Sequence, residues 1–246
     1  MTSEFFRFPL TPHLIWLGEG TPRDDKVLSQ IEAEALLAAS VVVEEKIDGA
    51  NLGISVNQDG ELRLQNRGDY LRVPFAGQFK KLSAWIALRE NDLISMLGNS
   101  LILFGEWCAA RHSVTYDRLP DWFLVFDIYD SSTRRFWSTK RRNDLAALLD
   151  LPVVSELLRK KTTLPSLKDL VLNNPSQYRD GMMEGLVIRQ ESEDWLETRA
   201  KLVRPDFTQA IDEHWRRKAI EWNGLANSVR TDGTDPYRKT RFHKKI

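Results

Sequence analysis

Lys46 has the sequence surroundings of a nucleophilic amine. A β-branched and acidic run, residues 41–45, leads directly into Lys46, and the turn-forming pair Asp48-Gly49 follows. We expect one buried strand to deliver the amine to this turn, with residues 52–56 folding back as the second strand of a hairpin. Poor solvation there would lower the pKa of the lysine, and a neutral amine is a nucleophile. The alternative is an ordinary hairpin with a solvated lysine, which an isolated Lys-x-Asp-Gly favours.

Five further segments with charged or aromatic side chains follow Lys46 in the sequence. Taken singly, Glu106 and Glu184 could be strand-end carboxylates paired with arginines. Phe126 could be plain core, and Arg67 could cap a turn. Their shared order favours a common site over these separate explanations. The segments are Arg67-Gly68, Leu103 to Trp107, Phe123 to Ile128, Glu184 to Arg189, and Arg199-Ala200-Lys201.

This series resembles the motifs of the covalent nucleotidyltransferase superfamily, which contains DNA ligases, RNA ligases and mRNA capping enzymes. The resemblance covers roughly residues 41–204. It implies an α+β fold, an antiparallel-sheet nucleotidyltransferase (adenylyltransferase) domain of the ligase and capping-enzyme type, over residues 1–205. A short, helical and basic C-terminal appendage is expected over residues 206–246.

The resemblance also implies which residues contact the nucleoside. Glu45 stands where the backbone of the family meets the adenine edge, and Phe126 would stack on the base. Glu106 is placed as the acid that accepts a ribose hydroxyl. Asn51 would lie near the ribose or the 3′ end of the nucleic acid. Arg67 would offer a forked cation to a phosphate or to the ribose.

The phosphates and a metal ion involve a second group of residues in this resemblance. Lys46 would attack the α-phosphorus of ATP and form lysyl-AMP, releasing pyrophosphate. Glu184 matches the acid that binds a divalent metal, Mg²⁺ or Mn²⁺, directly or through water. Lys201 would neutralise the α-phosphate during transfer.

One position departs from the pattern of the superfamily. The last motif is usually Lys-x-Lys, whereas this chain has Arg199-Ala200-Lys201. Either Arg199 replaces the first lysine, or the real pair is Lys201 with Arg204; we favour the first. Asp48 is expected to fix the turn, and Asp127 to serve the lysine network or the fold.

Within the superfamily, the chain is most similar to ATP-dependent RNA ligases of the ligase-2 type. The Asn51 position usually carries arginine in the DNA ligases. Only 42 residues follow Arg204, which is short for the five-stranded oligonucleotide-binding barrel of DNA ligases and capping enzymes. The NAD-binding extensions that precede the lysine in some ligases are not expected, which favours ATP. The implied substrate is RNA with 5′-phosphate and 3′-hydroxyl ends. The alternatives are a DNA-nick ligase acting with a partner, and a non-catalytic module that binds nucleic-acid ends.

The remaining pattern predicts strands in the middle of the chain with helices inserted between hairpins, which favours antiparallel sheets over a doubly wound fold. Residues 1–25 indicate an irregular arm, and residues 160–174 a mixture of short helix and loop. Ser138 is expected to cap a helix that ends at Leu149. The other expected helices are 25–39, 78–97 and 206–222, and the further strands are 61–68, 101–104, 122–129, 185–189 and 198–203.

Charge is balanced over the 246 residues but uneven along them. Lys+Arg and Asp+Glu both number 35, yet residues 214–246 carry a net charge of +6. Such a basic end suits a polyanion such as RNA, and Trp215 and Trp222 could stack on bases. A solvated tail is the alternative for the charge, and packing on the core is the favoured alternative for the tryptophans. The cations that we assign to RNA are Arg216, Arg217 and Lys218.

Metal–thiolate and membrane functions are not expected. The single cysteine, Cys108, excludes an intrachain disulfide and indicates an inert core thiol. His13, His112, His214 and His243 lack the spacing of metal ligands. No signal peptide and no apolar run approaching ~20 residues is recognised, so we expect a cytoplasmic protein with no membrane partner.

Overall fold

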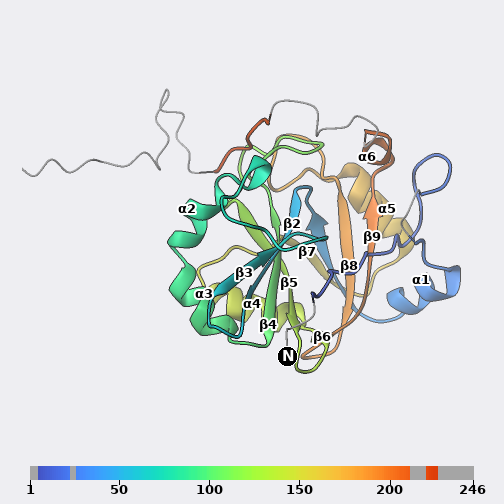
Figure 1. Cartoon of the computed structure of the whole chain (residues 1–246). Coiled ribbons are helices and arrows are strands. Elements are labelled where there is room, and N and C mark those ends of the chain that lie inside the picture. The colour runs from blue at the N-terminus through green and yellow to red at the C-terminus, as the bar shows by residue number, and fades with distance from the viewer. Residues whose placement is uncertain (1–4, 23–25, 211–219, 227–246) are drawn as a thin grey trace, which may run out of the picture.

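Two antiparallel sheets face each other in this protein (Figure 1). They are seen in a computed structural model that describes residues 5–22, 26–210 and 220–226. One sheet has the strand order β7-β1-β8-β9, and the other has the order β3-β2-β4-β5-β6. All neighbouring strands in both sheets run antiparallel. The predicted α+β fold with antiparallel sheets is therefore confirmed.

The five strands of one sheet are consecutive in the chain, and the strands before and after them form the other sheet. The four-stranded sheet contains β1 (Val41–Lys46), β7 (Glu156–Lys160), β8 (Gly185–Glu191) and β9 (Leu196–Val203). The five-stranded sheet contains β2 (Ala50–Val56), β3 (Leu62–Gln65), β4 (Leu101–Trp107), β5 (Phe123–Asp130) and β6 (Arg135–Phe136).

Helices cover each sheet on the side away from its partner, so that there are two apolar cores (Figure 1). The core of the four-stranded sheet is closed by α1 (Gln30–Leu37) and α5 (Leu164–Asn173). The core of the five-stranded sheet is closed by α2 (Leu82–Ala87), α3 (Glu90–Leu97) and α4 (Thr139–Leu148). A 3-10 turn, η1 (Gly77–Phe79), precedes α2, and α6 (Pro205–Ala210) follows β9. Among the described residues, no helix combines the length and apolarity needed to cross a bilayer.

The predicted hairpin around Lys46 is wrong, because β1 and β2 lie in different sheets. β1 pairs with β7 and β8, and β2 pairs with β3 and β4. The Asp48-Gly49 signal does mark a turn, but this turn carries the chain from one sheet to the other. Both strands are almost wholly buried, so each takes neighbours on both sides from distant parts of the chain. A turn signal reports only local geometry and does not specify these partners.

The other predicted elements agree in part. The helix that begins after Ser138 is confirmed, and the Ser138 hydroxyl caps it. The expected helix 25–39 begins only at Gln30, and the expected helix 78–97 is broken into η1, α2 and α3. Strand β7 was not expected, because its charged, half-exposed edge sequence lacks the apolar alternation of a strand.

The expected helix 206–222 is wrong at its carboxyl end. α6 ends at Ala210, and residues 220–222 are not helical. The segment between them, which includes Trp215, Arg216, Arg217 and Lys218, lies outside the described residues, as do His214 and His243. Trp222 forms a β-bridge with Ala110, so this part of the expected appendage packs on the loop that follows β4.

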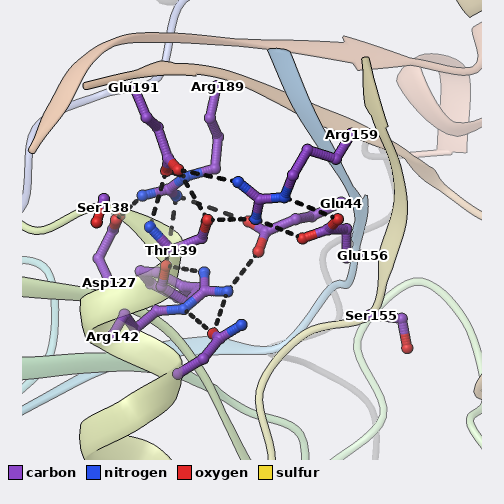
Figure 2. A network of polar contacts seen from close by, with 12 residues as sticks. Glu44, Asp127, Ser138, Thr139, Arg142, Ser155, Glu156, Arg159, Arg189 and Glu191 are labelled. Atoms are coloured by element: carbon purple, nitrogen blue, oxygen red, sulfur yellow. Dashed lines mark hydrogen bonds and ion pairs between the residues drawn. The ribbon is translucent and has the colours of Figure 1, made fainter. Parts of the chain in front are cut away.

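A buried set of charges joins the two sheets (Figure 2). Arg142 of α4 donates to Glu44 of β1 at 2.6 Å and to the carbonyl oxygen of Phe126 in β5 at 2.7 Å. Arg189 of β8 donates to Asp127 of β5 at 2.7 Å. The side chains of Glu44, Arg142 and Arg189 are each 1% exposed. Removing ions from water costs free energy, and only attraction to their charged partners compensates for this cost. The loss of one partner therefore destabilises the folded state.

Arg142→Ala is expected to lower the free energy of unfolding by about 3–5 kcal/mol, since it leaves the buried Glu44 carboxylate without its donor. Chemical denaturation followed by circular dichroism measures this loss. Lys140→Ala is the matched control, because Lys140 on the same helix forms an exposed ion pair with Asp144 and should change little. Equal effects of the two substitutions would contradict the role given to Arg142.

Candidate active site

A cavity of about 690 Å³ opens between the two sheets at the end of β1. The four-stranded sheet contributes Lys46, Arg199 and Lys201, and the five-stranded sheet contributes Asn51 and Glu106. Eight of the nine predicted site residues line this cavity: Glu45, Lys46, Asn51, Arg67, Glu106, Phe126, Arg199 and Lys201. The ninth, Glu184, lies just behind Lys46 and contacts it.

Lys46 forms an ion pair with Glu184, with 2.5 Å between Nζ and Oε1. Lys46 is the last residue of β1 and pairs with Gly185, the first residue of β8, so the strand register brings the amine beside Glu184. Burial acts to lower the pKa of Lys46, but attraction to Glu184 and Asp48 outweighs it and raises that pKa. Attraction to these carboxylates thus favours the ammonium form of Lys46 in the ligand-free protein, against the neutral amine expected from burial alone.

The turn after Lys46 is held by hydrogen bonds from a distant loop. The backbone N–H of Asp48 donates to the hydroxyl of Tyr116 at 2.8 Å. The Asp48 carboxylate accepts from the N–H of Ser113 at 2.9 Å and from its hydroxyl. A Cβ on Gly49 would lie 2.6 Å from the carbonyl oxygen of Trp107, so only glycine fits here. The expectation that Asp48 fixes the turn is confirmed.

Glu106 reaches into the cavity from β4, directly across from Asn51 of β2. Its Oε1 accepts from the N–H of Gly49 at 2.9 Å. Burial raises the pKa of Glu106 to about 7, although Lys46 acts to lower it. The Oδ1 atom of Asn51 is buried and has no hydrogen-bond partner among the described residues. An unsatisfied oxygen beside a cavity suits a donor on a bound molecule, such as a sugar hydroxyl.

Glu184 is almost fully buried, with 9% of its side chain exposed. Burial raises its pKa to about 7, against the opposing attraction of Lys46. Its second oxygen, Oε2, is buried and has no hydrogen-bond partner in the part of the chain that the structure describes. A free carboxylate oxygen of this kind fits a divalent cation that completes its coordination with water or phosphate oxygens. Within the described ranges, no cluster of three or more His, Cys, Asp or Glu residues could hold a metal by itself.

Glu45 points to the opposite face of β1 from Lys46. Its carboxylate accepts from the hydroxyl of Ser176 at 2.5 Å and from the N–H of Gln177 at 2.8 Å. The side chain is 1% exposed, and burial raises its pKa against these two hydrogen bonds. The carboxylate thus anchors the loop before β8, and only the main chain of Glu45 remains for the expected contact with an adenine edge.

Arg199 lies on the cavity wall, clamped by protein groups. Its guanidinium donates to Asp127 and lies 4.6 Å from the ring centroids of both Phe8 and Phe136. Burial would raise the pKa of Asp127, but Arg189 and Arg199 outweigh it and hold that pKa below its usual range. Asp127 therefore pairs with two arginines that join the sheets and serves the fold rather than the lysine network, which were the two roles expected for it.

The alternative pairing of Lys201 with Arg204 is not favoured by the geometry. Arg204 donates to the carbonyl oxygen of Leu172 at 2.8 Å and pairs with Asp206, and it does not line the cavity. Lys201 does line the cavity, and its charge acts on Glu184. Arg199 and Lys201 thus remain the two cations that β9 presents.

Phe126 and Arg67 enter the cavity from irregular backbone. The register of β4 and β5 shifts between Phe104 and Gly105, which leaves Phe126 without an opposite residue. The Phe126 ring packs edge-on against Phe8 at 5.2 Å and lines the cavity. Arg67 is exposed in the loop after β3, where its side chain can reorient to contact an anionic ligand.

Several residues at the site were not recognised from the sequence. Ser113 and Tyr116 hold the turn after Lys46, and His112 lies 3.9 Å from the Asp48 carboxylate. Burial lowers the pKa of His112, more than Asp48 raises it. These residues sit in the loop after β4, which has no periodic pattern to mark it. Cys108, at the start of that loop, is fully buried, and burial raises the pKa of its thiol, as expected of an inert core residue.

Comparison with known proteins identifies the family to which this chain belongs. A family model described as RNA ligase matches residues 39–203, whereas no curated protein matches the chain. The solved RNA ligase of Naegleria gruberi with PPi is similar over 85% of this chain and 62% of its own, with a TM-score of 0.59 and 19% identity. A mutant of that enzyme with ATP and Mn has a TM-score of 0.56 and 17% identity, and covers 85% of this chain and 64% of its own.

An archaeal ATP-dependent RNA ligase is similar over 80% of this chain and 48% of its own, with a TM-score of 0.55 and 20% identity. At these identities the structural likeness establishes the fold. The chain spans about 62% of the length of the Naegleria enzyme. The fold of this chain is therefore that of the solved RNA ligases. The family match covers most of the chain, which belongs to the RNA ligase family.

Glu106→Gln is expected to stabilise the protein at high pH. A carboxyl whose pKa rises to about 7 on folding binds its proton more tightly in the folded state, so stability falls as the pH rises from about 4.5 through 7. The glutamine variant escapes this loss, with a gain of roughly 1–3 kcal/mol at pH 8 that shrinks toward pH 4.5. Thermal unfolding across this range measures the gain. Glu193→Gln, at an exposed carboxylate, is the control, and a gain independent of pH would contradict the assignment.

Proposed function

We propose that this chain is an ATP-dependent RNA ligase that joins a 3′-hydroxyl to a 5′-phosphate through lysyl-AMP at Lys46. The observation that carries the proposal is the position of the Lys46 amine, at the wall of the cavity and 2.5 Å from Glu184. Membership of the RNA ligase family supports it. The Naegleria structures with ATP, AMP and Mn support ATP and a divalent metal as the requirements.

The reaction has three balanced steps. First, the Lys46 nitrogen bonds to the α-phosphorus of ATP, and the bond to pyrophosphate breaks. Second, an oxygen of the RNA 5′-phosphate attacks the same phosphorus, which breaks the bond to Lys46 and caps the RNA with AMP. Third, the 3′-hydroxyl attacks the 5′-phosphorus, and AMP leaves as the new phosphodiester forms. Lys46 is regenerated after the second step.

Lys46 must lose its proton before it attacks. In the ligand-free protein the nearby carboxylates hold that proton, because they raise the pKa of Lys46. When bound at Glu184 Oε2, a divalent cation would supply positive charge beside the phosphates and compete with Lys46 for the carboxylate. Once the ion pair is weakened, burial dominates, and burial lowers the pKa of Lys46. Burial and charge thus act on the amine in opposite directions.

The remaining cavity residues bind and orient the nucleotide. Phe126 offers an aromatic face to the adenine, and Glu106 and Asn51 offer oxygens to the ribose. Lys201 and Arg199 place two cations on one side of the cavity, where negative charge moves from the α-phosphate to pyrophosphate. Preorganised charges of this kind need no rearrangement when the bond to pyrophosphate breaks.

Incubation of the protein with radiolabelled ATP and magnesium is expected to label wild type with AMP and to leave Lys46→Ala unlabelled. A denaturing gel detects the label, which acid should release because a phosphoramide is acid-labile. Intact mass gives a second readout of the AMP adduct. The protein is first freed of bound AMP with pyrophosphate. Failure of this freed wild type to take up label would overturn the proposal.

RNA is the expected substrate, so a nicked RNA duplex should be sealed faster than a nicked all-DNA duplex. Product length on a denaturing gel measures sealing, and Lys46→Ala is the control for contaminating ligase. Preferential sealing of DNA would favour the alternative of a DNA-nick ligase. Binding of RNA ends by a wild type that takes up no label would favour a non-catalytic module.

A further inference from the structure

Residues 220–226, which we call the strap, pack against the loop that follows β4. This loop, residues 108–119, is called the tyrosine loop. The strap lies far from Lys46 in the sequence, yet its main chain bonds to both ends of the tyrosine loop. The bonds run from Asn223 N to Ala109 O at 3.0 Å, Gly224 N to Tyr116 O at 2.8 Å, Leu119 N to Gly224 O at 3.1 Å, Ala226 N to Leu119 O at 2.8 Å, and Arg111 N to Glu221 O at 2.8 Å.

The side chain of Asn223 connects the two ends of this loop. Its Nδ2 donates to the carbonyl oxygens of Cys108 at 2.8 Å and Ala110 at 3.2 Å. Its Oδ1 accepts from the N–H of Tyr116 at 2.9 Å. Asn223 is 6% exposed, and all three bonds go to main-chain groups. A buried amide with this many fixed partners sets the shape of the loop rather than merely filling space.

Tyr116 connects the tyrosine loop to the turn that follows Lys46. The Tyr116 side chain is 2% exposed, and its hydroxyl accepts the N–H of Asp48 at 2.8 Å. Ser113, in the same loop, donates to the Asp48 carboxylate. Asp48 stands two residues after Lys46, in the turn that carries the chain between the sheets. Two hydrogen bonds, one to the main chain of Tyr116 and one to its hydroxyl, therefore connect Asn223 to the turn beside the amine.

We propose that Asn223 is a positioning residue for formation of lysyl-AMP and acts through Tyr116 on the turn that follows Lys46. The proposal rests on the proposed function, since it concerns the same amine. Neither Asn223 nor Tyr116 lines the cavity, so neither is expected to contact ATP. Both are expected to influence the reaction through the placement of Lys46. A displacement of about 1 Å at a reacting group can cost on the order of 100-fold in rate.

Single-turnover labelling with ATP tests this role, because it separates the rate of adenylylation from ATP binding. Asn223→Ala is expected to lower the rate constant at saturating ATP by roughly 10- to 100-fold, with little change in the ATP concentration that gives half the maximal rate. Glu221→Ala is the matched control in the strap. It removes an exposed ion pair with Arg111 and is expected to react like wild type.

Tyr116→Phe keeps the buried ring and removes only the acceptor of the Asp48 N–H, so it tests the proposal even if Asn223→Ala fails to fold. It is expected to show the same split between rate and binding. The double variant should be no slower than the slower single variant, because both changes break one series of bonds.

The outcomes distinguish this proposal from the proposed function. Labelling of folded variants at the wild-type rate, even with a lowered melting temperature, would show that the strap only stabilises the fold and would overturn the inference. Multiplying losses in the double variant would overturn the link through Tyr116. A wild type that takes up no label would overturn the proposed function itself.

Discussion

The ion pair between Lys46 and Glu184 is the interaction on which the arrangement of the site depends. It exists because β1 ends where β8 begins, and the pairing of Lys46 with Gly185 fixes the two side chains together. A Cβ on Gly185 would lie 2.6 Å from the carbonyl oxygen of Leu202, so glycine lets β9 approach and bring Lys201 to the cavity. The amine is thus stored as a protonated, paired group. In the proposed mechanism, Lys46 becomes reactive when positive charge arrives at Glu184.

The cavity is assembled from two sheets that meet at the turn after Lys46. One sheet supplies the amine and the cations of β9, and the other supplies Glu106 and Phe126. In the proposed function, the first of these sheets binds the phosphates and the second binds the nucleoside. Among the described residues, no ladder of paired strands joins the two sheets. The buried charges around Asp127 and the hydrogen bonds of the tyrosine loop provide the connection instead.

The sequence was sufficient to place in the cavity those residues that lie in or at the ends of strands. Lys46 was predicted from its position at the end of a strand, and Glu106 and Lys201 from the resemblance to the nucleotidyltransferase motifs. The antiparallel class followed from the strand pattern. The hairpin failed, because an Asp-Gly turn does not specify which strands pair across it. Strand β7 was not predicted, because an edge strand with charged, half-exposed side chains lacks the apolar alternation that marks a strand in the sequence. Tyr116 and Asn223 lie in irregular segments 107 residues apart, and their contact arises only from tertiary packing.

The charges between the sheets have a consequence for how the molecule comes apart. Glu44, Arg189 and Arg199 belong to one sheet, Asp127 to the other, and Arg142 to the helix that covers the second sheet. Separating the layers would leave ions of both signs without partners in an apolar surface, at a cost on the order of several kcal/mol per ion. Neither sheet then has a stable existence by itself. The protein should melt in one cooperative transition, because the ions of each layer are paired with ions of the other.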